Sequence, residues 1–240
     1  MLKAFQVLVI LMALALSHRS LASGQSLEVE VLKEQIFQLA SSYEGQDDPD
    51  GSKQRSLDSL VLKLIQGRPM PPIKERIPLL KGVWKQVWGP YSYGRSRGGI
   101  DPRIGIKEIY QVVFEEGYYY NVAPYYPDGD GKREQISLLR GEFTLDSENT
   151  NGLKVRFTKY PGAEQRPENL PIWKLPSLVE KNQLENEITI VPRWIVWAFF
   201  GGGKLDEVYT DSDMRIVYGS SHRNPTDRSI YIMRRVEEGK

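Results

Sequence analysis

Helical spacing of hydrophobic residues marks the first part of the chain. One stripe, in which apolar side chains recur every three or four positions, consists of Val29, Leu32, Ile36, Leu39 and Ala40. A second stripe with the same spacing consists of Leu57, Leu60, Val61 and Leu64. Ser56 is placed to cap the second helix, and Gly67 and Pro69 are placed to end it. The pattern predicts two amphipathic helices, followed by a short third piece over Ile73–Leu80.

From Gly82 onward the spacing changes to two, which is typical of β-strands. In the first strand Trp84, Gln86 and Trp88 share one face. Further alternating segments, separated by turn residues, cover 109–115, 118–125, 135–143, 153–160, 205–210, 214–219 and 229–235. About eight short strands without intervening helices predict an antiparallel barrel or sandwich, because a soluble all-β domain has to close or cover its edges. The aromatic segment 188–200 fits either a buried strand or a short helix.

The first residues of the chain have the composition of a secretory signal peptide. Lys3 precedes an apolar run at 4–16 that is broken only by Gln6, and Ser20-Leu21-Ala22 offers small residues at the two positions that a signal peptidase reads. A membrane span needs about 20 apolar residues, so an uncleaved anchor is the less favoured alternative. We therefore predict a signal peptide at 1–22, a helical pair at 23–70 and a β-barrel domain at 71–240. The protein is expected to be exported to a periplasm or thylakoid lumen, or secreted.

Charge and residue content exclude several function classes. The chain is close to neutral, with 32 basic and 31 acidic residues, so no nucleic-acid partner is expected. A peripheral contact with a membrane stays open. There is no Cys, and of two His only His222 lies outside the predicted signal, which excludes a zinc site built from Cys and His. We predict no metal and no cofactor.

Carboxylates gather at two places. The first group consists of Asp128, Asp130 and Glu134. These residues lack the spacing of a calcium-binding motif, which favours a polar turn without metal. The second group, near the C-terminus, consists of Asp206, Glu207, Asp211 and Asp213. Neighbouring carboxylates can divide acid and base roles, whereas in a hairpin turn they accept backbone hydrogen bonds. Asp211 and Asp213 therefore form a candidate polar site.

Aromatic residues are abundant, with five Trp and thirteen Tyr. Aromatic side chains favour pleated sheet, so ordinary strand positions account for them. Alternatively, inward-facing aromatics line a barrel that is wide enough to hold one small ligand. On the second interpretation the predicted lining consists of Trp84, Trp88, Tyr91, Tyr110, Tyr118, Tyr120, Trp194 and Trp197.

Two motifs resemble the plastid lipid-associated protein family, also called the fibrillin family. Leu79–Trp88 is similar to the leucine-glycine-x-tryptophan start of that family, and Leu205–Ile216 is similar to its tyrosine-x-aspartate-x-aspartate-x-arginine-isoleucine stretch. The resemblance implies a lipocalin-like barrel that associates with or carries lipids, quinones or isoprenoid pigments. It also implies that Gly82 and Trp84 seal one end of the barrel, with Arg215 packed close to them.

These features predict a non-catalytic binder or carrier of an apolar small molecule. One alternative is a calycin-type enzyme that uses Asp206, Asp211 or Asp213 as acid or base. Another is an interaction module that binds a second protein through the N-terminal helices. The sequence leaves the ligand and the oligomeric state open.

Overall fold

The computed structural model describes residues 27–43, 48–89, 105–106, 108–126, 135–165, 171–180, 202–221 and 224–237. Several sequence predictions fall outside these ranges, namely the signal peptide, the segment 188–200 with Trp194 and Trp197, the residues Tyr91 and His222, and the carboxylates at 128, 130 and 134. Within the described ranges no helix has the length and apolar content that a membrane crossing needs.

Nine strands form a single sheet. Eight lie on the predicted segments and extend several of them, and the two-residue β2 is additional. Their bounds are β1 (Gly82–Trp88), β2 (Gly105–Ile106), β3 (Tyr110–Val113), β4 (Tyr118–Tyr126), β5 (Gln135–Leu145), β6 (Gly152–Gln165), β7 (Gly202–Thr210), β8 (Met214–Ser221) and β9 (Asn224–Arg235).

The sheet closes on itself. From β3 to β9 each strand pairs antiparallel with the next, and β1 pairs with both β3 and β9. The ring therefore runs β1-β3-β4-β5-β6-β7-β8-β9 and returns to β1, while β2 adds to β4 beside β3. A closed ring leaves no strand edge to aggregate. The fold is an eight-stranded antiparallel β-barrel, which confirms the predicted mainly-β, lipocalin-like fold class.

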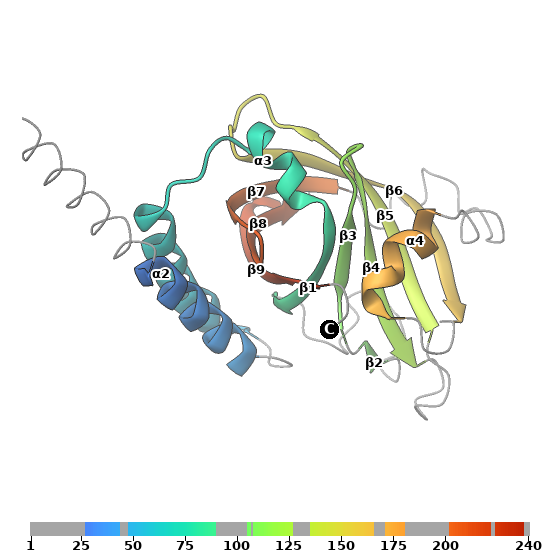
Figure 1. Ribbon diagram of the computed structural model, residues 1–240, viewed down its shortest axis with the longest axis horizontal. Coiled ribbons are helices and arrows are strands. Elements are labelled where there is room, and N and C mark those ends of the chain that lie inside the picture. Colours follow the sequence, from blue (N-terminus) through green and yellow to red (C-terminus); the bar gives the residue numbers. More distant parts are fainter. Residues whose placement is uncertain are drawn as a thin grey trace, which may run out of the picture.

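Two N-terminal helices lie side by side against the outside of the barrel (Figure 1). The first spans residues 27–42 and the second, α2, spans Ser52–Gly67. Their predicted stripes are buried together with outward-facing side chains of β8 and β9, including Ile216 and Ile232. Burial of these stripes, rather than helix propensity alone, stabilises both helices.

The start of α2 differs from the prediction. Ser56 does not cap the helix but lies inside it, where its hydroxyl donates to the carbonyl oxygen of Ser52 at 3.0 Å. The helix begins a turn earlier because Asp48 accepts the amides of Lys53 and Gln54 at 3.0 and 2.9 Å. A carboxylate that satisfies first-turn amides is a strong start signal.

The third helix closes one end of the barrel. This helix, α3 (Ile73–Leu80), lies where β1 begins (Figure 1). Its buried side chains Ile73 and Leu80 pack with Trp84 inside the ring. The Trp84 indole N–H donates to the Leu80 carbonyl at 2.7 Å. The barrel is therefore sealed at this end by the chain itself.

A short helical segment covers part of the outer wall. It comprises the 3-10 turn η1 (Ile172–Lys174) and α4 (Leu175–Glu180), which cross in front of β4 and β5 in Figure 1. Leu175 is buried there against outward-facing residues of β3, β4 and β5. The strands β3 to β5 therefore carry apolar side chains on both faces.

Candidate functional site

The barrel interior is the candidate site, and contacts define which side chains face it. One buried cluster joins residues from strands that lie all around the ring, which can meet only inside it. Its members are Trp84 of β1, Val113 of β3, Tyr119 of β4, Phe143 of β5, Leu153 of β6 and Met233 of β9, with Ile73 and Leu80 of α3.

Tyr119 occupies much of the closed half. The residue opposite it in the β4–β5 pair is Gly141, and a Cβ at Gly141 would lie only 2.4 Å from Tyr119 Cζ. The absence of a side chain at Gly141 thus makes room for the ring. Burial raises the pKa of the Tyr119 phenol, so this group stays neutral at physiological pH.

Toward the other end the interior is apolar but less tightly covered. Val155 and Phe157 of β6, Leu205 of β7 and Tyr231 of β9 pack on the inner cluster and are only partly buried. Trp84 and Leu153, in the closed half, are 0% and 1% exposed. The closed half is therefore filled by the chain, whereas inward-facing apolar surface is accessible in the other half.

A buried ion pair crosses the interior. Glu207 and Arg215 have side chains that are 0% and 2% exposed. Arg215 Nε donates to Glu207 Oε2 at 2.9 Å, and its Nη2 donates to Oε1. The remaining Nη1 donates to Oε1 of Gln111, and Gln111 Nε2 donates to Oδ1 of Asn121 at 3.0 Å. A polar row thus runs from β7 and β8 to β3 and β4.

Arg76 of α3 completes the closed end. Its guanidinium is 1% exposed and donates to the carbonyl oxygens of Pro71 and Glu207 at 2.7 and 2.6 Å. It also donates to Asn151 Oδ1 at 3.0 Å and Thr210 Oγ1 at 3.3 Å. Four acceptors, two of them on β7, hold this guanidinium and fix α3 on the barrel, because a buried guanidinium has to satisfy its donors.

The arginine that stacks on Trp84 is Arg235. Its guanidinium carbon lies 4.1 Å from the centre of the indole ring. Its N–H groups donate to the carbonyl oxygens of Leu79, Lys81 and Ser212. Gly82 adopts φ +123°, and a Cβ there would lie 2.6 Å from Arg235 Nη1. Gly82 and Trp84 thus lie at the sealed end with Arg235 stacked on the indole, while Arg215 pairs with Glu207 and also contacts Met233 of the inner cluster.

The predicted aromatic lining is distributed over both faces of the wall. Of the described residues, Trp84 faces inward at the closed end. Tyr110, Tyr118 and Tyr120 pack in the outer cluster around α4, and Trp88 packs outside against the N-terminal helices. The structure therefore does not bring these five aromatics together around one cavity.

Asp211 and Asp213 attach the first helix to the barrel. Lys33 Nζ, on that helix, lies 3.0 Å from Asp211 Oδ2 and 2.6 Å from Asp213 Oδ1. Asp211 also accepts the Met214 amide at 2.9 Å and the Tyr209 hydroxyl at 2.8 Å. These contacts lie outside the barrel, in the cluster under the helices.

The protonation of these carboxylates fits this docking contact. Burial acts to raise the pKa of Asp211, but hydrogen bonds that involve Asp213, the Met214 amide and Lys33 hold it at about 2. Burial raises the pKa of Asp213. A general acid or base works best with a pKa near the working pH. Asp211 is therefore suited to a permanent ion pair rather than to proton transfer near neutral pH.

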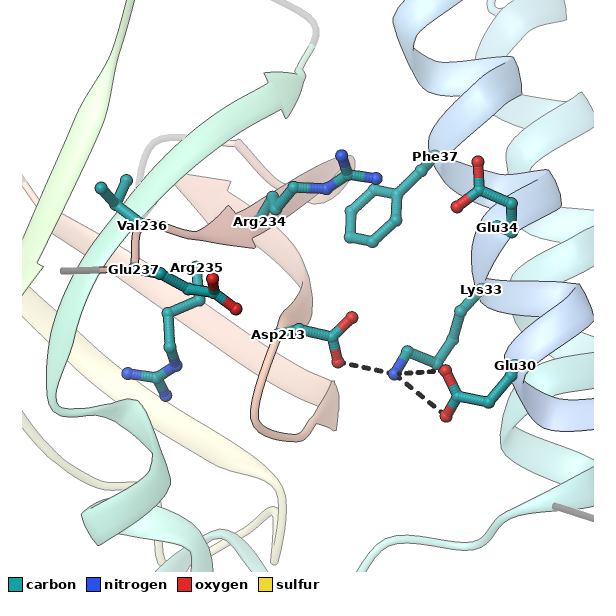
Figure 2. Close-up of a pocket in the computed structure, with 9 residues that line it drawn as sticks. All are labelled: Glu30, Lys33, Glu34, Phe37, Asp213, Arg234, Arg235, Val236 and Glu237. Atoms are coloured by element: carbon teal, nitrogen blue, oxygen red, sulfur yellow. Dashed lines mark hydrogen bonds and ion pairs between the residues drawn. The ribbon is translucent and has the colours of Figure 1, made fainter. Parts of the chain in front are cut away.

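A groove lies between the first helix and the end of β9 (Figure 2). Its cavity volume is about 410 Å³. Lys33 reaches across it to Asp213 and also pairs with Glu30 on its own helix, and the Arg234 guanidinium stacks 3.9 Å from the centre of the Phe37 ring. The Lys33–Asp213 pair and the Arg234–Phe37 contact both join the first helix to the barrel, so the groove is interpreted as a joint between them.

Sequence reasoning missed Arg76, Gln111, Tyr119 and Asn121, and it placed Glu207 in a carboxylate group without its partner Arg215. A signal existed for Tyr119 and Asn121, since they share the strand face opposite to Tyr118 and Tyr120. Nothing in the local pattern distinguishes Arg76 and Gln111 from surface residues.

Comparisons with known proteins identify no family: no family model matches the chain, and no curated protein matches it.

Proposed function

We propose that this protein binds one apolar small molecule in the open half of its barrel and does no chemistry on it. The observation that carries the proposal is the difference between the two halves of the interior. One end is sealed by α3, Trp84 and Arg235, while Val155 and Leu205 face inward and stay partly accessible near the other end. An eight-stranded barrel has room for its own side chains and at most one small ligand.

The energetics favour a hydrophobic ligand of modest size. Removal of about 200 Å² of apolar surface from water contributes ~5 kcal/mol, before the cost of lost translational and rotational freedom. The wall residues that would receive the ligand, Val155, Phe157, Leu205 and Tyr231, supply mainly apolar surface. A contribution of ~5 kcal/mol corresponds to a dissociation constant of about 0.2 mM, so affinities no tighter than this are expected for ligands that bury such an area.

The class of ligand and the compartment belong to the same proposal. The resemblance to plastid lipid-associated proteins favours lipids, quinones or isoprenoids as the ligand. The first 22 residues favour export of the protein, and a peripheral contact with a membrane is compatible with both. Native mass spectrometry of protein purified from its own organism tests the first point, since a stoichiometric hydrophobic molecule is expected. N-terminal sequencing of the same sample tests the second, with a start at Ser23 expected.

The cavity itself is tested by filling it. Val155→Trp places a large ring in the accessible half, whereas Arg156→Trp places the same ring on the outer face of the same strand, where Arg156 is exposed. The probe is N-phenyl-1-naphthylamine, an uncharged dye that becomes fluorescent in apolar sites. The cavity-filling variant is expected to lose at least tenfold in affinity, and the Arg156 variant should bind like the wild type.

Equal binding by both variants would place the dye outside the barrel and refute the proposal. Because Val155→Trp could disturb packing, Phe157→Ala supplies a second test, since it enlarges the same half. It should change the dye affinity while the circular dichroism spectrum stays native. No effect of either inward substitution on binding would likewise contradict the proposal.

A further inference from the structure

The polar row inside the barrel has a fixed direction. A guanidinium has five donors and no acceptor, so the Gln111 atom that faces Arg215 has to be the carbonyl oxygen Oε1. The amide nitrogen of Gln111 then faces β4, where it donates to Asn121 Oδ1 at 3.0 Å. Each amide orientation follows from the one before it, because the chain of hydrogen bonds starts at a group that can only donate.

The direction leaves a donor at the end of the row. Gln111 occupies Oδ1 of Asn121, so the Asn121 Nδ2 group points away from Gln111. No residue in the described part of the chain accepts a hydrogen bond from this Nδ2 group. Asn121 is partly buried, two residues beyond the inward-facing Tyr119 on β4, and thus farther from the sealed end. Asn121 shares its strand face with Tyr119, whose ring centre lies 6.3 Å from that of Phe157 in the accessible wall. An amide donor on this face favours an acceptor in a ligand, because an unmatched polar group costs free energy when a ligand excludes water.

The geometry points to a barrel that selects hydrophobic ligands with a neutral hydrogen-bond acceptor, such as a ketone or quinone carbonyl, whose oxygen binds Asn121 Nδ2. This inference rests on the proposed function and narrows its ligand class. The apolar body of the ligand contacts Val155, Phe157 and Leu205. Pure hydrocarbons leave the donor unmatched and bind more weakly than their carbonyl analogues of the same shape.

The charge balance of the row favours a neutral acceptor over an anion. The one cation that the row contains, Arg215, already forms a two-point ion pair with Glu207. A carboxylate ligand at Asn121 would therefore find the cation of the row already paired, and an unpaired carboxylate inside the barrel carries a large desolvation cost. Asn121 is accordingly a specificity-determining residue for an uncharged oxygen.

The test compares three ligands on one ring system: 2-acetylnaphthalene with a carbonyl, 2-isopropylnaphthalene of nearly the same shape, and 2-naphthoate with a charge. Their dissociation constants are measured by displacement of N-phenyl-1-naphthylamine. The ratio of hydrocarbon to ketone dissociation constants is the readout, because it cancels the shared apolar contribution. In Asn121→Leu this ratio should fall about tenfold, as expected for one hydrogen bond.

Two further variants keep the test interpretable. Asn121→Asp retains the size of the side chain and an acceptor for Gln111 but replaces the terminal donor, so the ratio should also fall at least tenfold. Leu205→Ala removes apolar wall and should weaken ketone and hydrocarbon by the same factor, with the ratio unchanged. The naphthoate should bind the wild type more weakly than the ketone.

An unchanged ratio in both Asn121 variants, with ketone and hydrocarbon still binding, would overturn this inference and leave the apolar-cavity proposal standing. Tighter binding of the naphthoate than of the ketone would overturn it as well. If neither neutral ligand displaces the dye from the wild type, the proposed function itself is refuted, and the selectivity inferred from it is refuted as well.

Discussion

Removal of one member of the Glu207–Arg215 pair should be far more damaging than removal of both. Both side chains are essentially inaccessible, at 0% and 2% exposure, and two hydrogen bonds join them. Glu207→Gln leaves the guanidinium as an uncompensated charge inside the barrel. Loss of one partner of a buried pair typically costs about 3 to 5 kcal/mol, a large share of the ~5 to 15 kcal/mol that stabilises a domain.

The double variant Glu207→Leu with Arg215→Met should recover most of that loss. Apolar side chains of similar length fill the space without a charge to desolvate, and such replacements are often neutral or stabilising. Gln111 then loses its donor, which costs about 1 kcal/mol. The contacts of Arg76 remain, because it bonds the backbone oxygen of Glu207 rather than the carboxylate. We therefore expect the double variant within about 2 kcal/mol of the wild type.

Urea unfolding at pH 7, followed by tryptophan fluorescence, gives the free energies of unfolding for the wild type, the single variants Glu207→Leu and Arg215→Met, and the double variant that combines them. The expected coupling between the two sites is large and favourable, since each single loss includes the cost of the stranded partner. A single variant that loses less than about 1 kcal/mol, or a double variant that loses the sum of the singles, would refute the reasoning.

Three other perturbations have defined outcomes. Lys33→Met removes the buried ammonium that bridges Asp211 and Asp213 and leaves Asp211 with the half-exposed Arg68, 3.7 Å away, so it should lower the free energy of unfolding by about 3 kcal/mol. Lys63→Met, at an exposed position on α2, should change it little. Gly141→Ala forces a methyl group against the tyrosine ring opposite and should cost about 1 to 3 kcal/mol by thermal unfolding, while Gly67→Ala, with no atom within 4 Å of the added carbon, should be tolerated. The Glu148 amide and two lysines lower the pKa of Asp146 to about 2 from 3.8, so its stabilisation is complete above pH 3.8 and is lost as the pH falls toward 2. NMR titration should find this low pKa, and Asp146→Asn should reduce the acid sensitivity of unfolding; an ordinary pKa for Asp146 would contradict this.

Strand alternation predicted where the barrel strands lie but could not predict which face points inward. On β4 the rings of Tyr118 and Tyr120 are buried against α4, while Tyr119 is buried inside. Because helices cover part of the outside, both faces of such strands are apolar, and the usual polar-out signal is absent. On β1 the register shifts between Gln86 and Trp88, which turns Trp88 outward although its spacing from Trp84 is even.

The interior polar groups lay beyond sequence reasoning for a different reason. Arg235 stands opposite Trp84 only because the first and last strands pair to close the ring, and nothing local to Arg235 indicates this. Arg215 donates hydrogen bonds to both Glu207 and Gln111 across the interior, although Gln111 lies 104 positions before Arg215 in the chain. Contacts of this kind depend on closure and register, which a single sequence specifies only after the whole barrel is assembled.

The most direct test of the central claim is the position of a bound apolar molecule. Methyl-labelled protein saturated with 2-isopropylnaphthalene should show intermolecular nuclear Overhauser effects to Val155 and Leu205, which face inward in the accessible half, and none to the exposed Leu62 on α2. Overhauser effects confined to methyl groups of the outer surface or of the helix groove, or the absence of any at saturation, would contradict a ligand-binding barrel.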